Sequence, residues 1–195
     1  MHSILYLLFE MATAGVFLVP VFLLLNCCFF KNTKRTFFYL LLAFYISAMW
    51  VLVGMPNAYY QRFKPTMQLV LFLPMLEDLE SALLNVVLFF PMGFLLPVLW
   101  QKFRKFGNIL IFCLGASLLI ELAQIFTYRL TDINDLITNT LGGILGYLLG
   151  RRVIKSFIPT PVGRSKDIVP VFSVTLAVMF FLYPLLAEKL WLMIF

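Results

Sequence analysis

Long apolar stretches dominate this chain and restrict what it can fold into. They run for about twenty residues, carry few charges and do not alternate between apolar and polar positions. Hydrophobic residues make up 63% of the sequence and charged residues only 12%, whereas a soluble domain is about half apolar and about a quarter charged. Because lipid cannot hydrogen-bond an exposed backbone, only helices or a closed barrel span a membrane. The continuous runs favour helices, so the sequence predicts an all-α integral membrane protein.

The apolar runs predict a bundle of about six transmembrane helices within a single membrane domain, residues 1–195. We expect the spans at about residues 4–30, 36–54, 81–100, 108–127, 133–150 and 168–187. The fifth has the shortest apolar part, residues 136–149. At about 1.5 Å per residue, this part does not cross a membrane core of about 30 Å. It must extend toward Ile158, with Arg151 and Arg152 reaching the interface, or be partly re-entrant. The first run lacks a basic leader region and is too long for a signal peptide, so we expect it to remain as a span.

Basic residues lie mainly in three of the predicted loops. Loops 31–35, 101–107 and 151–167 hold eleven of the fifteen Lys and Arg residues. The positive-inside rule places these loops in the cytoplasm and both termini on the extracytoplasmic side. Since the basic residues are divided among short loops, they indicate topology and argue against nucleic acid as a partner.

The longest predicted connection, residues 55–80, lies on the outer side. Its second half, residues 67–76, is apolar but too short to span the membrane, and Pro74 would break a helix there. We therefore expect an interfacial or re-entrant segment. Glu77, Asp78 and Glu80 follow at the start of the third span, where negative charge complements the positive end of a helix.

Polar side chains gather near the outer ends of the middle spans. Glu121 lies roughly 9 Å below the outer surface in the fourth span, and Gln124 follows on the same helix face. Asp135 opens the fifth span, Asn139 lies one turn deeper, and Asn85 lies about one turn into the third span. An ionisable group inside a span indicates a functional site. We expect these residues to line an outward-facing polar pocket that binds a ligand.

Two further polar residues, Arg129 and Asp132, sit in the loop between the fourth and fifth spans. Arg129 could fold back over Glu121 or pair with an aspartate. Simpler roles remain open: the two aspartates of this region could only cap the fifth helix, and the two asparagines could only bridge helices. Glu10 falls near the same depth, unless the first span begins after it.

Asp135, Asn139, Gly142, Gly146 and Gly150 follow one another at intervals of three or four residues. They form one stripe on the fifth span, and small residues at this spacing let two helices approach closely in lipid. We expect the glycines to serve helix packing. The same contact would bring Asp135 and Asn139 toward the fourth span.

The sequence carries no pattern typical of a hydrolase or a metal centre. It has neither an H-E-x-x-H nor a G-x-S-x-G motif, and its single histidine is His2. The three cysteines show no zinc-ligand spacing. We therefore expect no metal and no cofactor. As an alternative, Glu121 and Asp135 would act as general acid and base or hold a divalent cation.

Two spaced motifs carry a family resemblance across residues 74–147. They are Asn85-x3-Phe89-x-Pro91-x-Gly93-Phe94 and Glu121-x2-Gln124, Arg129-x2-Asp132-x2-Asp135-x3-Asn139-x2-Gly142-x3-Gly146-Tyr147. Their order and spacing resemble the VanZ-like family of small bacterial membrane proteins, one member of which is linked to resistance to the glycopeptide teicoplanin. One departure is Leu71, where the family often has Asn. The resemblance implies a multi-pass protein of the bacterial cytoplasmic membrane, with residues 74–147 as its core, and supplies no established reaction.

Four hypotheses follow for the function. The first is a non-catalytic envelope protein that binds a lipid-linked cell-wall precursor or a lipoglycopeptide at the polar pocket, among membrane lipids, and lowers susceptibility to teicoplanin-type antibiotics. The second is an intramembrane enzyme acting on a lipid-linked substrate. The third is a lipid transporter, although the chain shows no internal repeat of the kind found in transporters. The fourth is a structural or assembly role. The oligomeric state stays open.

Overall fold

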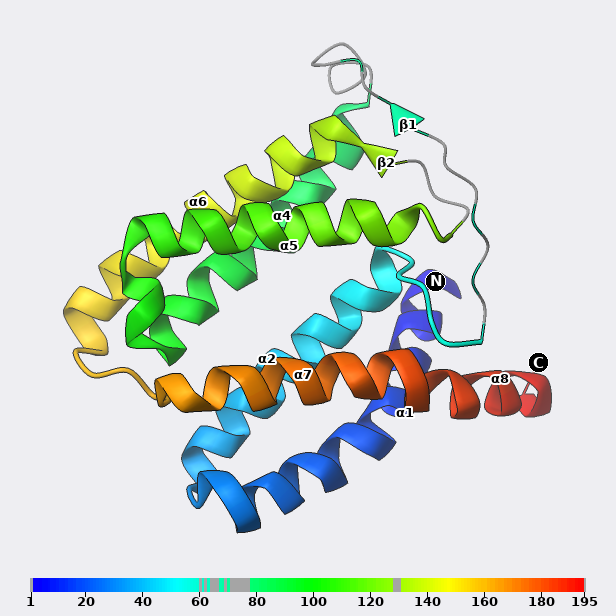
Figure 1. Ribbon diagram of the computed structural model, residues 1–195, viewed down its shortest axis with the longest axis horizontal. Helices are drawn as coiled ribbons and strands as arrows, with labels where there is room; N and C mark the ends of the chain where they lie inside the picture. Colours follow the sequence, from blue (N-terminus) through cyan, green and yellow to red (C-terminus); the bar gives the residue numbers. More distant parts are fainter. Residues whose placement is uncertain are drawn as a thin grey trace. The chain divides into compact units, whose positions relative to one another are not determined.

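The computed structural model (Figure 1) describes the chain except for residues 1, 60, 62, 64–66, 69, 71–77, 128–130 and 195. It confirms the predicted all-α membrane class. Five of the described helical segments are long and apolar enough to cross a membrane: Leu5–Phe30, Thr33–Leu52, Leu79–Leu99, Phe106–Gln124 and Ser165–Leu190. The chain divides into two compact units, the first made of Met1–Gln61 with Lys166–Phe195 and the second of Arg62–Ser165. That the whole chain acts as a single domain stays a prediction.

The first unit contains the N-terminal and C-terminal helices. They are α1 (His2–Leu25) with a π-helical turn at Asn26–Phe30, α2 (Thr33–Leu52), and α7 (Ile168–Ala177) joined by a second π-helical turn to α8 (Tyr183–Ile194). A short turn links α1 to α2, and Lys31 takes a positive φ of 51° there. Asn32 caps α2, because its side chain accepts a hydrogen bond from the Arg35 N–H at 2.9 Å. The side chain of Asn26 accepts hydrogen bonds from the Asn32 N–H and the Thr36 hydroxyl and so closes the turn.

A buried ion pair ties α2 to the start of α7 within this unit. Asp167 is fully buried, and its Oδ2 accepts a hydrogen bond from the Tyr39 hydroxyl at 2.8 Å and lies 3.5 Å from Arg35 Nη1. Taking a carboxylate and a guanidinium out of water is costly unless they pair. From the sequence, Arg35 was interpreted only as a charge that indicates topology, and its partner Asp167 was not predicted.

Glu10 takes part in a second buried contact of the first unit. It is only 4% exposed, and its Oε2 accepts a hydrogen bond from the Tyr183 hydroxyl of α8. Tyr6, one turn earlier on α1, also hydrogen-bonds to this carboxylate. Glu10 therefore lies inside α1, and its role in the described structure is to join α1 to α8.

The second unit contains α4 (Leu79–Leu99), α5 (Phe106–Gln124) and α6 (Ile133–Phe157). Asp78 caps α4 by accepting hydrogen bonds from the Ser81 hydroxyl at 2.7 Å and the Ser81 N–H at 3.0 Å, which hold the pKa of the Asp78 carboxyl below its usual value. Of the two alternatives for the fifth predicted span, the structure takes the longer helix. α6 runs for 25 residues, or about 37 Å, although it is too polar to count among the five segments given above.

The main chains of α4 and α6 touch along the predicted glycine stripe. A Cβ on Gly142 would overlap the carbonyl oxygen of Val86, and one on Gly146 would overlap that of Phe90. A Cβ on Gly150 would lie 3.2 Å from the carbonyl oxygen of Phe94. These contacts advance in the same direction along both helices, so α4 and α6 are parallel. The predicted close packing is present, but it is made with the third span.

Candidate functional site

Glu121 occupies the last turn of α5 and connects it to the start of α6. Its side chain is 5% exposed, and its Oε2 accepts a hydrogen bond from the backbone N–H of Asp132 at 2.9 Å. The Thr131 hydroxyl donates to the backbone carbonyl of Glu121 at 3.1 Å. A buried carboxylate needs such a donor, since its desolvation is otherwise uncompensated. The sequence predicted the need for a partner and the structure identifies one.

The backbone N–H of Asp132, which donates to Glu121, belongs to one of two paired two-residue strands. Strand β1 (Met67–Gln68) pairs in parallel with β2 (Thr131–Asp132), with Met67 opposite Thr131 and Gln68 opposite Asp132. Of the predicted interfacial or re-entrant segment, residues 67–76, the structure describes only 67, 68 and 70. Pro74 and Glu77 lie outside the described residues. The described part is an extended strand beside the start of α6.

Asp132 caps α6, as one of the simpler alternatives proposed. Its Oδ1 accepts hydrogen bonds from the N–H and the side-chain Nδ2 of Asn134, both at 2.8 Å. The Nδ2 of Asn134 also donates to the carbonyl of Val70 at 2.8 Å. Asn134 is buried and was missed by sequence reasoning. The signal that could have found it is the Asp-x-Asn spacing, because Asx side chains hydrogen-bond to backbone groups two residues away.

Asp135 lies half-buried in the first turn of α6. Its carboxylate and that of Asp132 both interact electrostatically with Glu121. The structure thus brings three of the predicted site residues together at one end of the second unit. Arg129, the predicted cation of this site, lies outside the described residues.

Asn139 lies one turn deeper on α6 and reaches α5. Its Nδ2 donates a hydrogen bond to Ser117 Oγ at 2.9 Å, and both side chains are buried. The Oδ1 of Asn139 is buried and has no hydrogen-bond partner among the described residues. One turn further, a Cβ on Gly143 would overlap the side chain of Cys113. We refer to Ser117, Glu121, Asp132, Asp135 and Asn139 as the polar cluster.

The α5–α6 contact that forms the polar cluster differs from the contact made by the glycine stripe. Gly142 and Gly146 face α4, whereas Asn139 and Gly143 face α5. The expectation that one contact would both pack the glycines and gather the polar residues is therefore wrong. Gly142 and Gly143 are consecutive residues, so they point in directions about 100° apart on the helix. One can therefore pack against α4 while the other packs against α5.

Gln124 and Asn85 lie near the polar cluster. Gln124 ends α5 and is buried, and its carbonyl accepts hydrogen bonds from the N–H and hydroxyl of Thr127. Asn85 is half-buried on α4. Because the adjacent Val86 faces Gly142, Asn85 lies within one helical turn of the level of Asn139.

In the residues that the structure describes, no group of three or more His, Cys, Asp or Glu side chains is arranged to hold a metal ion. The three carboxylates of the polar cluster are therefore not placed as a joint cation site. The buried Glu121 carboxylate, the two half-buried aspartates and the buried Asn139 oxygen are all acceptors, so the arrangement suits a ligand that donates hydrogen bonds.

The Asn139–Ser117 hydrogen bond makes a testable contribution to stability. We expect Ser117→Ala to lower the free energy of unfolding by about 1 kcal/mol, because it leaves a buried amide donor without its acceptor. Thermal unfolding of the purified chain in detergent measures the change. Ser47→Ala is the matched control: Ser47 is equally buried, but within the part of the chain that the structure describes its hydroxyl bonds only to the Ala43 carbonyl of its own helix. An equal effect of both substitutions would contradict the prediction.

Two comparisons with known proteins match parts of this chain. A family model described as VanZ/LLP1 matches residues 17–155. Over 68 residues the chain is 46% identical to a protein from Enterococcus faecium named Protein VanZ, a match that covers 33% of this chain and 40% of that protein. The match thus spans less than half of that relative. No solved structure matches the chain.

Proposed function

Since the chain belongs to the VanZ/LLP1 family, we propose that it binds a lipid-linked cell-wall precursor or a lipoglycopeptide at the polar cluster and thereby lowers susceptibility to teicoplanin-type antibiotics. In this proposal the chain is a multi-pass protein of the bacterial cytoplasmic membrane. Both termini and the polar cluster lie on the extracytoplasmic side, which follows from the distribution of Lys and Arg among its loops. The Glu121 carboxylate, buried between two helices, is the observation that carries the proposal.

The chemistry of the cluster supports binding of a hydrogen-bond donor. Two aspartates add negative charge beside Glu121, and Asn139 Oδ1 is a buried acceptor with no partner in the described residues. A buried amide oxygen without a partner is disfavoured, and an incoming N–H or O–H would satisfy it. Peptide and sugar portions of cell-wall precursors and glycopeptides are rich in such donors.

Apolar side chains next to the cluster support an acyl chain on the same ligand. Leu118 and Leu122 of α5 are about half exposed, and so is Leu141 of α6. These residues face away from the helix contacts that bury Ser117, Glu121 and Asn139. A ligand with a polar head and an acyl chain would therefore bury both ends, and each buried methylene contributes about 0.8 kcal/mol.

Replacing Glu121 tests the proposal in cells. We expect Glu121→Gln, expressed in a teicoplanin-susceptible host, to reduce the minimum inhibitory concentration of teicoplanin to that of the empty vector. Gln keeps the size of the side chain and an oxygen to accept the Asp132 N–H, and removes only the charge. Glu80→Gln is the control, because Glu80 is an exposed acid in the first turn of α4. Immunoblots of the membrane fraction confirm that both variants reach equal abundance.

Two further measurements decide whether the cluster binds or catalyses. Asp135→Asn and Asn139→Ala should also reduce protection, and full protection from these and from Glu121→Gln would contradict the proposal. Purified wild-type chain incubated with lipid-linked cell-wall precursor should leave it unchanged. A product formed by the wild type but not by Glu121→Gln would establish an enzyme and overturn the non-catalytic proposal.

A further inference from the structure

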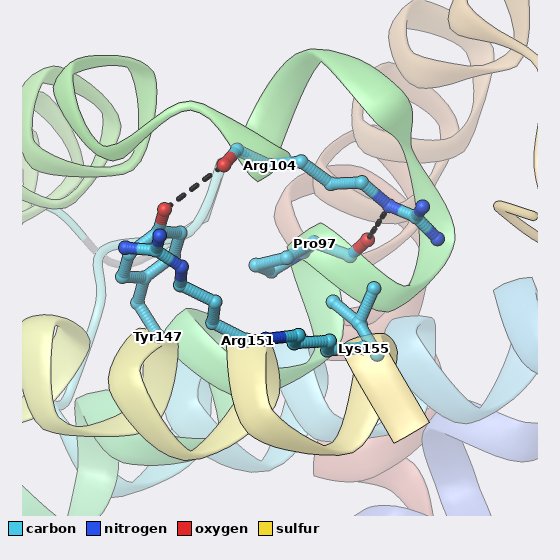
Figure 2. A pocket seen from close by; sticks show the side chains of 6 residues that line it. Pro97, Arg104, Tyr147, Arg151 and Lys155 are labelled. Atoms are coloured by element: carbon cyan, nitrogen blue, oxygen red, sulfur yellow. Dashed lines mark hydrogen bonds between the residues drawn. The ribbon is translucent and has the colours of Figure 1, made fainter. Parts of the chain in front are cut away.

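A basic pocket lies at the end of the second unit that is remote from the polar cluster (Figure 2). Its volume is about 220 Å³. The residues that line it come from the end of α4, the following turn and the last turns of α6: Pro97, Arg104, Tyr147, Arg151, Ile154 and Lys155. Three of the six are cations, and the sequence motifs did not single out any of those three as a site.

Arg104 is fixed as one wall of the basic pocket. Its guanidinium donates to the carbonyls of Pro159 at 2.6 Å, Ile158 at 2.9 Å and Pro97 at 3.3 Å. The backbone carbonyl of Arg104 in turn accepts a hydrogen bond from the Tyr147 hydroxyl at 2.9 Å, drawn in Figure 2. Carbonyls orient a guanidinium but do not neutralise it. Two of the five N–H groups of Arg104 make no hydrogen bond to the residues that the structure describes. The wall is therefore rigid and still fully charged.

Arg151 and Lys155 supply two more charges from consecutive turns of α6 (Figure 2). They stand four residues apart, so they are neighbours on the helix surface, and like charges at this spacing destabilise a helix by about 0.2–0.5 kcal/mol. The stretches that build the pocket contain no acid to offset them: residues 81–120 and 136–166 have neither Asp nor Glu. The positive charge of Arg104, Arg151 and Lys155 is therefore not offset by an acidic residue of these two stretches.

A topology signal alone does not account for this arrangement. The positive-inside rule requires basic residues near the membrane but not their convergence on one cavity. Arg152 meets that requirement equally well, yet it does not line the pocket. Basic pockets between membrane helices are typical binding sites for anionic lipid headgroups, and guanidinium groups recognise phosphate with paired hydrogen bonds.

We propose that the basic pocket binds a phosphate group, carried by an anionic phospholipid or free in solution, at the cations that line it. Pro97 and Ile154 provide an apolar floor beside the charges. Phe157, one turn beyond, is 79% exposed and can contact an acyl chain. The site is separate from the polar cluster, so its test is independent of the proposed function.

Binding to short-chain lipids tests the proposal on the full chain. The purified protein in detergent is titrated with dioctanoyl phosphatidylglycerol, with dioctanoyl phosphatidylcholine and with inorganic phosphate, and Kd is measured by microscale thermophoresis. We expect phosphatidylglycerol to bind more tightly than phosphatidylcholine. Arg151→Gln should weaken this binding about fivefold, and Arg151→Gln with Lys155→Gln about 25-fold, since each basic residue near a membrane surface contributes about 1 kcal/mol. Arg152→Gln is the matched control and should change Kd less than twofold.

Each outcome of the titrations has a defined meaning. If inorganic phosphate competes with phosphatidylglycerol, the phosphate group alone suffices; if it does not, the recognised group is the lipid headgroup. Equal binding of the two lipids without phosphate binding, or an equal loss in Arg151→Gln and Arg152→Gln, would overturn the proposal. The substituted residues are exposed, so the melting temperature without ligand should stay unchanged. Were Arg151→Gln unstable, Lys155→Gln alone would replace it, with the same expected loss of about fivefold.

Discussion

Asp167→Ala is expected to lower the free energy of unfolding by about 3–5 kcal/mol, because it leaves the Arg35 guanidinium buried without its carboxylate. Asp167 is fully buried and the Arg35 side chain is 10% exposed, so water cannot replace the missing partner. The Tyr39 hydroxyl loses its acceptor in the same variant. Chemical or thermal unfolding of the purified chain in detergent measures the loss.

Two controls separate the ion pair from its surroundings. Replacing both partners, Arg35→Met with Asp167→Leu, should restore most of the stability, because no charge is then left buried. Lys34→Met removes an exposed charge from the adjacent position and should have little effect. Were Asp167→Ala no more harmful than Lys34→Met, the pair would not hold α2 to α7.

Gly146→Ala should destabilise the second unit by about 3 kcal/mol, at the upper end of what overpacking costs. The added methyl group would overlap the carbonyl oxygen of Phe90, which belongs to the main chain of α4 and cannot turn aside as a side chain does. The two helices would have to separate, and contacts along both would be lost. The melting temperature of the purified chain and its resistance to proteolysis in membranes report this loss.

The matched control is Gly115→Ala on α5. A Cβ at Gly115 meets nothing within 4 Å, so the substitution should leave stability unchanged or raise it by about 0.5–1 kcal/mol through the better helix propensity of alanine. Equal stability of Gly146→Ala and Gly115→Ala would mean that α4 and α6 do not touch at this position.

The spans could be predicted from the sequence because apolar runs report directly on burial in lipid. The start of α6 at Ile133 was predicted, and its end at Phe157 agrees with the longer of two alternatives. The partner of the glycine stripe could not be predicted. Small residues at regular spacing indicate that some helix approaches closely, but they carry no information about which one.

The candidate site was predictable to a similar degree. The burial of Glu121 follows from its place in an apolar run, and the approach of Asp135 follows from the short connection between the two spans. The donor to Glu121 is a backbone N–H held by a two-residue strand, and backbone groups leave no trace in residue types. Asp167 and the basic pocket were missed because their contacts join residues far apart in the sequence, which one sequence alone does not pair.

The contact between α4 and α6 has a consequence for how a bilayer molecule could reach Asn139. Carbonyl groups of α4 lie against three glycines of α6 from Gly142 to Gly150, which leaves no width for a hydrocarbon tail between these helices. The glycines of α6 thus close the side that faces α4 to a bilayer molecule.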